Sequence, residues 1–341
     1  MPLRRKRGWL SDMPKRAQFW IGIFISLLCL GAVLWAVDLE QVLQSLKSAD
    51  WRAVLFIAAG QVAFMLLRAW RWQLMLGKGV GYWSLFHAQN IGYLITNLLP
   101  FRLGDLARSY LAGLEPGVSG VQALSSVALE RVLDMLIIVV FFGAAAPLAP
   151  TLPGGMGIVA AVICGAAVVS FLVMLLAAAN RSRAMGLARW ALEKVKRLDT
   201  PLWLGRVGSF LDGFNVLVHW RVLLPVMGLS LVLWLCIVSG YYGGLWGFWP
   251  GVTLPAALFT LCAAAFGVSA PSSPGFVGVF HGAVVLGLSV FPVTAGQALS
   301  FAVVYHATTY LVVLILGLVG LWQSGRSLGA IVTAVQKRSA G

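Results

Sequence analysis

Long apolar runs, each bounded by basic residues or by glycine and proline, repeat along the whole chain. About 20 consecutive apolar residues are enough for a helix to cross the hydrocarbon core of a bilayer. Six runs reach this length, and we expect each of them to form a full transmembrane helix. These runs are residues 19–37, 53–76, 119–147, 156–179, 222–248 and 297–322.

Two further apolar segments are interrupted by proline and glycine. Residues 84–113 break at Pro100, and residues 254–291 break at the stretch APSSPGFVG. Proline removes a backbone donor and clashes with the preceding turn, so neither segment can form one straight helix. We expect two re-entrant hairpins, the first entering from the cytoplasmic side and the second from the opposite side. The alternative is that all eight segments span, with the breaks as kinks and interfacial turns.

Both breaks contain a proline followed four residues later by a glycine. The pairs are Pro100 with Gly104 and Pro271 with Gly275. Two interrupted segments in corresponding positions of two halves are typical of inverted-repeat transporters. The pattern therefore predicts an all-α polytopic membrane protein with about six full transmembrane spans, two broken hydrophobic hairpins and an inverted repeat.

The composition agrees with this class, since 60% of the 341 residues are hydrophobic and only 11% are charged. The net charge of +14 is concentrated outside the apolar runs. Basic residues fill the N-terminal segment 1–18, the loop 180–221 and the tail 323–341, which places all three on the cytoplasmic side under the positive-inside rule. We therefore expect a single transmembrane domain, residues 19–322, in a cell inner membrane with both termini cytoplasmic. No nucleic-acid-binding motif accompanies the basic residues.

The loop 180–221 places Trp190, Leu192, Val195 and Leu198 among arginine and lysine. This pattern predicts a basic amphipathic helix that lies on the cytoplasmic face. The four cysteines stand alone within apolar runs, which argues against a disulfide, a metal site or a redox cofactor. We expect no metal and no cofactor.

The first candidate for chemistry is the stretch NLLPFRLGDLARSY, residues 97–110. A helix that begins after Pro100 presents Arg102, Asp105 and Arg108 at steps of three residues, so that Asp105 can pair with either arginine. The start of a helix also favours an anion through its free N–H groups and its dipole. We interpret the stretch as part of a polar cavity that receives a lipid phosphate. The alternative is a short cytoplasmic turn with charges at the interface.

The second candidate is the stretch LERVLDML, residues 129–136, inside a predicted span. Glu130 and Asp134 share one helical face, and Arg131 can reach Asp134 three residues later. Charges at this depth usually face the interior of a bundle and mark a pathway. The alternative is a span that begins only at Leu133, with the charges at the interface.

The third candidate is the stretch APSSPGFVGVFHG, residues 270–282. Ser273 is a good N-cap and Pro274 a good first residue, so a new helix is expected to begin there. Gly275 and Gly278 permit close approach of the backbone.

The second half of the chain has no acidic residue after Asp212, and it has no lysine or arginine between Val222 and Ser324. Its titratable groups of note are therefore His281, His306 and several tyrosines. The two histidines could form a proton relay, although a lone histidine on an apolar face is more often structural.

The stretch LLRAWRWQLML ends the second span with Arg68, Arg71, Trp70 and Trp72. An aromatic belt with a cytoplasmic anchor explains this arrangement, and participation of Arg68 in a cavity is the weaker interpretation.

Three of these stretches, NLLPFRLGDLARSYL, ALERVLDML and PSSPGFVGVF, resemble in this order the signature segments of the lysylphosphatidylglycerol synthase transmembrane-region family. RAWRW is similar to the arginine-rich end of that family's second span, and the resemblance covers nearly the whole chain. The family includes the flippase half of bacterial multiple peptide resistance factors, which moves aminoacylated phosphatidylglycerol between leaflets. The chain departs from the family pattern at Asp105, where glutamate is common, and at His281, where many members have an acidic residue.

The resemblance implies a flippase without the soluble aminoacylation domain of fused members, so any lipid-modifying enzyme would be a separate partner. We expect membrane lipids as the other partners. No nucleotide-binding loop is present, which predicts passive or gradient-driven transport. The alternatives are an integral-membrane enzyme on polyprenyl-phosphate or phospholipid substrates, and a scaffold for a separate lipid synthase. The expected headgroup site consists of Arg102, Asp105, Arg108, Glu130, Arg131, Asp134, Ser273, Gly275 and Gly278.

Overall fold

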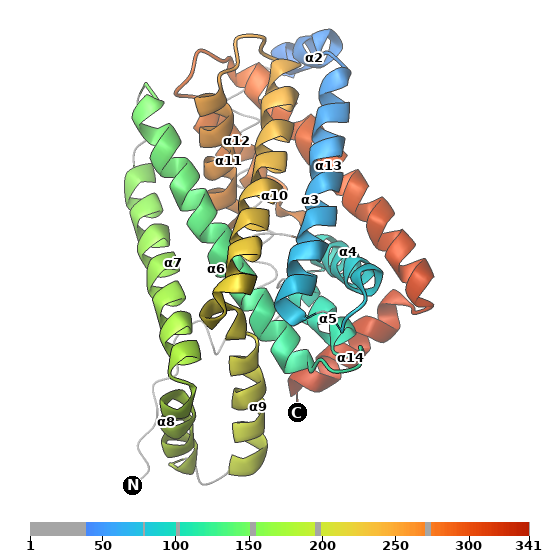
Figure 1. The fold of residues 1–341 in the computed structure, drawn as a ribbon. Helices are drawn as coiled ribbons and strands as arrows, with labels where there is room; N and C mark the ends of the chain where they lie inside the picture. The colour runs from blue at the N-terminus through green and yellow to red at the C-terminus, as the bar shows by residue number, and fades with distance from the viewer. Residues whose placement is uncertain are drawn as a thin grey trace, which may run out of the picture.

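The computed structural model describes residues 39–77, 79–99, 103–150, 155–194, 199–269 and 274–340. In these ranges the chain is helical, with thirteen α-helices (Figure 1). The helices are α2 (Leu39–Ser48), α3 (Arg52–Leu76), α4 (Tyr82–Leu98), α5 (Leu103–Ala112), α6 (Gly120–Ala145), α7 (Met156–Ala179), α8 (Arg181–Glu193), α9 (Thr200–Asp212), α10 (Trp220–Trp246), α11 (Leu254–Ser269), α12 (Val279–Leu288), α13 (Ala295–Ser324) and α14 (Leu328–Ala340).

Four helices are long and apolar enough to cross a membrane: α3, α7, α10 and α13. They coincide with four of the predicted spans. The predicted span 119–147 forms α6, a helix of 26 residues that includes three charged side chains. The predicted span 19–37 lies outside the described residues. These helices make the chain a multi-pass membrane protein.

Polar side chains fix where two of the long helices begin. The Ser119 hydroxyl accepts a hydrogen bond from the Gln122 amide at 3.0 Å, which caps α6. Thr294 and Gln297 cap each other's backbone at the start of α13, with distances of 3.1 and 3.2 Å. Such caps satisfy amide groups that have no partner within the helix. The helix boundaries therefore follow from local chemistry as well as from the apolar runs.

Each interrupted segment forms a helical hairpin. Helices α4 and α5 pack along each other, as do α11 and α12. In the first hairpin, a Cβ atom on Gly104 would clash with the backbone of Gly92, so the two arms approach as closely as glycine allows. The α4–α5 hairpin lies in the lower half of the bundle and the α11–α12 hairpin in the upper half (Figure 1).

The long helices connect the two hairpins. Helices α3 and α10 run side by side, and a Cβ atom on Gly60 would lie 2.6 Å from the carbonyl of Cys236. Helix α13 packs against α4 of the first hairpin, while α6 packs against α11 of the second. Each hairpin is thus held by a long helix from the other half of the chain.

The predicted start of the helix after the second break is wrong. Ser273 lies outside the described residues, and Pro274 belongs to a short 3₁₀ turn, η3 (Pro274–Phe276), before α12 begins at Val279. Gly275 and Gly278 have φ angles of 71° and 84°, which a right-handed helix cannot contain. The glycines therefore delay the helix by about one turn.

Three regions predicted as loop, surface helix or tail are more ordered than expected. The loop 180–221 contains two helices, α8 and α9, which pack against each other instead of forming a single amphipathic helix. Residues 39–48 form α2, and residues 328–340 form α14. Helix α14 packs against α5 and buries Ile331 and Val335.

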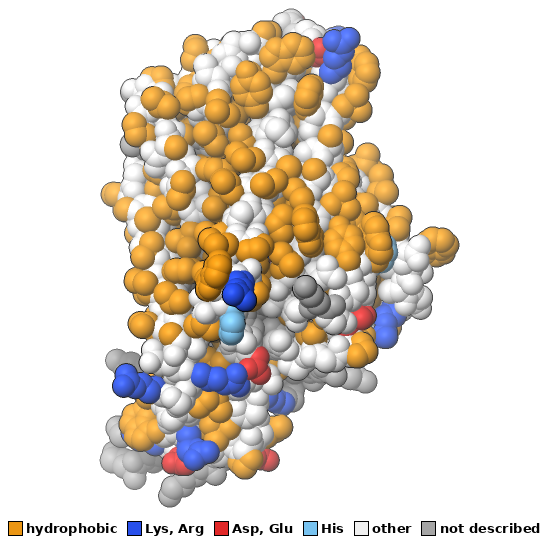
Figure 2. All heavy atoms as spheres, viewed as in Figure 1, with side chains coloured by type: hydrophobic (Ala, Val, Ile, Leu, Met, Phe, Trp, Pro, Cys, Tyr) orange, Lys and Arg blue, Asp and Glu red, His pale blue; other side chains and the backbone are white. Residues whose placement is uncertain are grey.

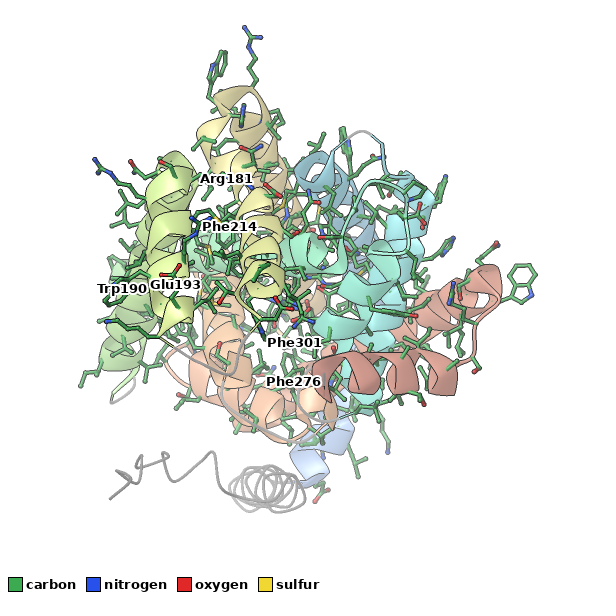
Figure 3. All side chains as sticks on the ribbon, turned by 90° about the horizontal axis from the view of Figure 1, so that it is seen from below. Arg181, Trp190, Glu193, Phe214, Phe276 and Phe301 are labelled. Carbon is green, nitrogen blue, oxygen red and sulfur yellow. The ribbon has the colours of Figure 1, made fainter. Side chains whose placement is uncertain are left out.

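The surface separates apolar from charged side chains. Figure 2 shows hydrophobic side chains over most of the visible face, with a small charged group at the top and the other charged side chains in the lower half. Seen from below, Arg181, Trp190 and Glu193 mark α8 at the edge of the bundle, whereas Phe276 lies towards the middle (Figure 3). A broad apolar surface between charged ends is the arrangement that a bilayer requires.

Candidate functional site: a buried arginine–carboxylate cluster beside a cavity

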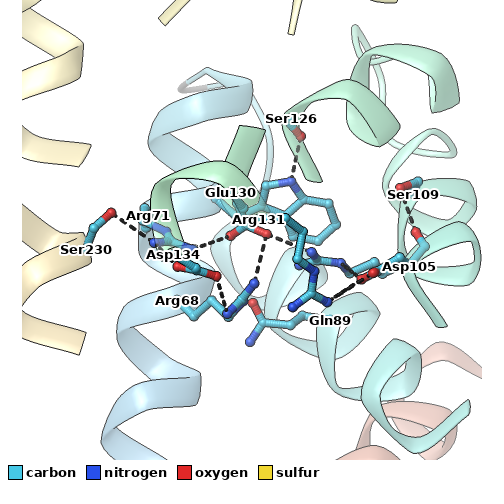
Figure 4. A network of polar contacts seen from close by, with 12 residues as sticks. Arg68, Arg71, Gln89, Asp105, Ser109, Ser126, Glu130, Arg131, Asp134 and Ser230 are labelled. Atoms are coloured by element: carbon cyan, nitrogen blue, oxygen red, sulfur yellow. Dashed lines mark hydrogen bonds and ion pairs between the residues drawn. The ribbon is translucent and has the colours of Figure 1, made fainter. Parts of the chain in front are cut away.

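Seven charged side chains from α3, α5 and α6 form one cluster inside the bundle (Figure 4). We call it the charge cluster. Four members are arginines and three are carboxylates, so the described cluster carries a formal charge of +4 − 3 = +1. Its members are Arg68, Arg71, Asp105, Arg108, Glu130, Arg131 and Asp134.

Glu130 lies at the centre of the cluster. Its carboxylate is 2.7 Å from Arg108, 3.2 Å from Arg71 and 3.4 Å from Arg68, and its side chain has no exposed surface. A buried carboxylate is stable only when cations and hydrogen bonds replace its hydration. Glu130 therefore joins α6 to both α3 and α5.

Asp134, one turn further along α6, completes the inner part of the cluster. It pairs with Arg71 at 2.8 Å and with Arg68 at 3.1 Å. Helix α10 contributes two polar contacts: the Trp234 indole donates to Asp134 at 3.1 Å, and Arg71 donates to the Ser230 hydroxyl at 2.9 Å. The inner cluster thus connects three long helices.

The pair of Arg131 and Asp105 forms the outer part of the cluster. Arg131 donates to both carboxylate oxygens of Asp105, at 2.8 and 3.0 Å, and 40% of its side chain remains exposed. The predicted pair of Arg131 with Asp134 is wrong. Successive residues are about 100° apart around a helix, so Arg131 points to Asp105 on α5, while Asp134 points to α3 and Glu130 lies between α3 and α5.

Arg71 is a site residue that the sequence interpretation missed, and for Arg68 the weaker interpretation, participation in the cavity, is confirmed. As members of a cytoplasmic anchor they would be exposed, yet both are almost completely buried. Trp72 is buried too, and its indole donates to the Ser126 hydroxyl at 2.9 Å, whereas Trp70 is exposed as a belt residue would be. Charge balance was the available signal, because Arg131 alone cannot neutralise two carboxylates on α6.

Arg108 pairs with Asp105 at 3.2 Å, as the spacing of three residues predicts. Its guanidinium also lies over the ring of Trp72, 5.1 Å from the centroid. The Nη1 atom of Arg108 is buried and has no hydrogen-bond partner. Arg108 therefore retains an unused donor inside the bundle.

A cavity of about 340 Å³ adjoins the outer part of the charge cluster. This volume lies within the usual range for small-molecule sites. Its charged lining residues are Arg68, Asp105, Arg131 and Asp134, which all belong to the first half of the chain. The rest of its lining includes residues from both hairpins and from α10 and α13, among them Thr96, Asn97, Trp234, Tyr241, Ser269, Gly275, Phe276, Phe280, Tyr305, His306 and Tyr310.

Described residues beside the two breaks, Asn97 and Gly275, meet at this cavity. The Tyr310 hydroxyl on α13 donates to the carbonyl of Asn97, at the end of the first hairpin's first arm, at 2.7 Å. The ring of Tyr310 also lies against Gly275, where an added Cβ would be 2.9 Å from it. One tyrosine therefore touches the broken backbone of both hairpins.

The predicted headgroup-site residues occupy four kinds of position. Asp105, Arg131, Asp134 and Gly275 line the cavity. Arg108 and Glu130 lie behind it in the charge cluster, and Gly278 donates its amide to His281 at the start of α12. Arg102 and Ser273 lie outside the described residues.

In the described part of the chain, no three side chains of histidine, cysteine, aspartate or glutamate are arranged so that they could hold a metal ion. The carboxylates of the charge cluster are already engaged by arginine. What the described site offers chemically is a set of guanidinium donors beside a cavity, a combination suited to phosphate or carboxylate.

Comparison with known proteins identifies a family. The model of the lysylphosphatidylglycerol synthase transmembrane region matches residues 19–317. No curated protein and no solved structure matches the chain. The matched region contains every member of the charge cluster and all residues that line the cavity. The chain belongs to the lysylphosphatidylglycerol synthase transmembrane-region family.

Proposed function

We propose that the protein is a lipid transporter that moves a phosphate-containing headgroup between the two leaflets through the cavity. The observation that carries this proposal is the position of Arg131. Its guanidinium belongs to a long helix in the membrane, yet it is partly exposed and lines the cavity with Arg68. Charged groups inside a bilayer are costly and usually serve a pathway. A planar guanidinium fits phosphate through paired hydrogen bonds.

The exposed pair with Asp105 gives Arg131 a means of exchanging partners. While the cavity is empty of lipid, the carboxylate neutralises the guanidinium. An arriving phosphate competes with that carboxylate for the same donors, so binding replaces one charge pair by another. The inner cluster around Glu130 is almost completely buried and holds the helices that carry this exchange.

We also propose an inverted repeat, in which α3, α4–α5 and α6 correspond to α10, α11–α12 and α13. The pattern of packing supports it, because α4 contacts α13 as α11 contacts α6. In this arrangement the hairpins enter from opposite sides, and both termini are cytoplasmic, in the inner membrane. The basic residues near α8 and α9 agree with this orientation under the positive-inside rule.

The test is lipid movement by the purified protein in liposomes with fluorescent anionic and zwitterionic phospholipids. We expect headgroup-selective movement by the unaltered protein and its loss in Arg131→Ala and Arg102→Ala. The matched control is Arg206→Ala, since Arg206 lies on α9 beside Trp203 and away from the cavity. No movement of any lipid by folded protein would favour an integral-membrane enzyme or a scaffold for a separate synthase.

A further inference from the structure

The wall of the cavity opposite the charge cluster contains a pair of histidines. His281 on α12 and His306 on α13 have ring centroids 5.1 Å apart. His306 lines the cavity, and His281 is buried behind it, where its Nδ1 accepts a hydrogen bond from the Gly278 amide at 3.3 Å. The sequence separation of 25 residues gives no sign of this proximity.

The surroundings of the pair contain no charged side chain from the second half of the chain, which has none between Val222 and Ser324. Its aromatic neighbours are Phe280, Tyr305 and Tyr310, and Tyr241 on α10 contacts Tyr305. The backbone of Gly275, in the second break, lies close enough to the His306 ring to interact with it. The charged groups on the other side of the cavity are Arg68, Asp105, Arg131 and Asp134.

Among the described titratable groups around this part of the cavity, His281 and His306 are the ones whose ordinary pKa is nearest to neutral pH. The carboxylates Asp105 and Asp134 are each held ionised by direct pairs with arginine. Tyrosine loses its proton only at high pH. Histidine is the side chain that changes charge in the physiological range. Two imidazole rings so close together accommodate one added proton far more easily than two.

We propose that headgroup movement is coupled to one proton carried by the pair of His281 and His306. This inference rests on the proposed function. A proton on the pair adds a positive charge to a cavity that already presents Arg68 and Arg131, so the protonated state favours an anionic headgroup. Proton and anion therefore bind together and cross in the same direction. The proton is taken up by an imidazole nitrogen from the acidic side and released on the other.

The contact between His306 and Gly275 places the proton-binding pair next to the backbone of the second break. His306 contacts Gly275, whose φ of 71° makes it part of the turn that interrupts the hairpin. One helical turn along α13, Tyr310 holds the first break through Asn97. A change of charge on the pair thus acts on the residues where both broken segments meet.

The test uses the full chain in sealed liposomes with a pH difference of about one unit and the membrane potential clamped at zero. The probe is phosphatidylglycerol with a fluorescent acyl chain. Coupling of one anion to one proton predicts about tenfold accumulation in the leaflet on the alkaline side. This ratio does not depend on the orientation of the protein. An entrapped pH dye is expected to report proton flux when a lipid gradient is applied.

The variants are His281→Gln and His306→Gln, singly and together. We expect the double variant to distribute the lipid equally between leaflets at any pH difference. His219→Gln is the matched control, because His219 is exposed at the start of α10, and it is expected to keep the tenfold ratio. Rapid but equal distribution by the unaltered protein would overturn proton coupling and leave the proposed function intact. Absence of movement without any gradient would instead contradict the proposed function.

Discussion

The two hairpins have similar constructions and different chemistry. Each consists of two short helices around a break with proline and glycine, and each packs against a long helix from the other half of the chain. The first hairpin supplies Asp105 and Arg108 to the charge cluster, whereas the second presents glycine, aromatic rings and His281. The packing of the two halves depends on small residues and long helices. The polar residues of the two halves can therefore differ in chemistry without a change of fold.

This difference separates two roles within the cavity. The wall from the first half favours anions, because two of its residues, Arg68 and Arg131, belong to a charge cluster whose four arginines outnumber its three carboxylates. The wall from the second half provides apolar surface and a pair of groups that can change charge. The predictions below are designed to break this contrast, and they are ordered by the size of the expected effect.

Removal of the central charge is expected to have the largest effect. Glu130→Gln leaves three buried arginines with too little negative charge, and breaking a buried pair in this way costs about 3–5 kcal/mol. Thermal unfolding in detergent measures the loss. Glu193→Gln on the exposed face of α8 is the control, with an expected change below about 0.5 kcal/mol. Similar unfolding temperatures for the two variants would contradict the central role of Glu130.

The second largest loss of stability is expected from a substitution where α4 and α5 approach each other closely. In Gly104→Ala the new Cβ meets the backbone of Gly92, which cannot move aside, and such overpacking costs about 1–3 kcal/mol. In Gly267→Ala, in the second hairpin, the new Cβ would lie 2.5 Å from the Cβ of Ala283, a less severe overlap than that of Gly104→Ala, so a smaller loss is expected. Gly143→Ala on α6 meets nothing and is expected to be neutral or slightly stabilising. An equal loss of stability in Gly104→Ala and Gly267→Ala would show that the two hairpins do not differ in how closely their arms pack.

Loss of the hydrogen bond between Tyr310 and Asn97, which joins the two halves of the chain, is expected to have a smaller effect on stability. Tyr310→Phe keeps the ring against Gly275 but removes the hydrogen bond to Asn97, which costs about 0.5–1.5 kcal/mol. The same unfolding measurement applies, with Tyr242→Phe as the control because Tyr242 is exposed on α10. A Tyr310→Phe variant as stable as the control would show that the hydroxyl does not hold the first break.

The smallest loss of stability is expected from breaking an exposed ion pair. Arg181 and Asp212 pair between α8 and α9, and both side chains are exposed. Asp212→Asn is expected to cost about 1 kcal/mol or less, and the loss is expected to vanish at high salt because solvent and ions screen the pair. A loss comparable to that of Glu130→Gln would show that burial does not explain the strength of the charge cluster.

The sequence predicted the scaffold better than the site. Apolar length and helix-breaking residues depend on local physics, which is why α3, α7, α10 and α13 and both breaks were correctly anticipated. The partners of Arg131 and the burial of Arg68 depend on which helices lie side by side, and spacing within one helix contains no such information. The late start of α12 has a local cause, the positive φ angles of Gly275 and Gly278. The sequence interpretation explains these glycines by close approach of the backbone, and it therefore misses the delay.

A double-mutant cycle on Arg131 and Asp105 tests the central claim most directly. The measured quantity is the initial rate of movement of an anionic phospholipid in liposomes. If Arg131 binds the phosphate, Asp105→Ala retains movement because it frees the guanidinium, while Arg131→Ala and the double variant lose it to the same extent. If the pair only holds α5 against α6, both single variants lose movement and the double variant recovers part of it, which would contradict the account.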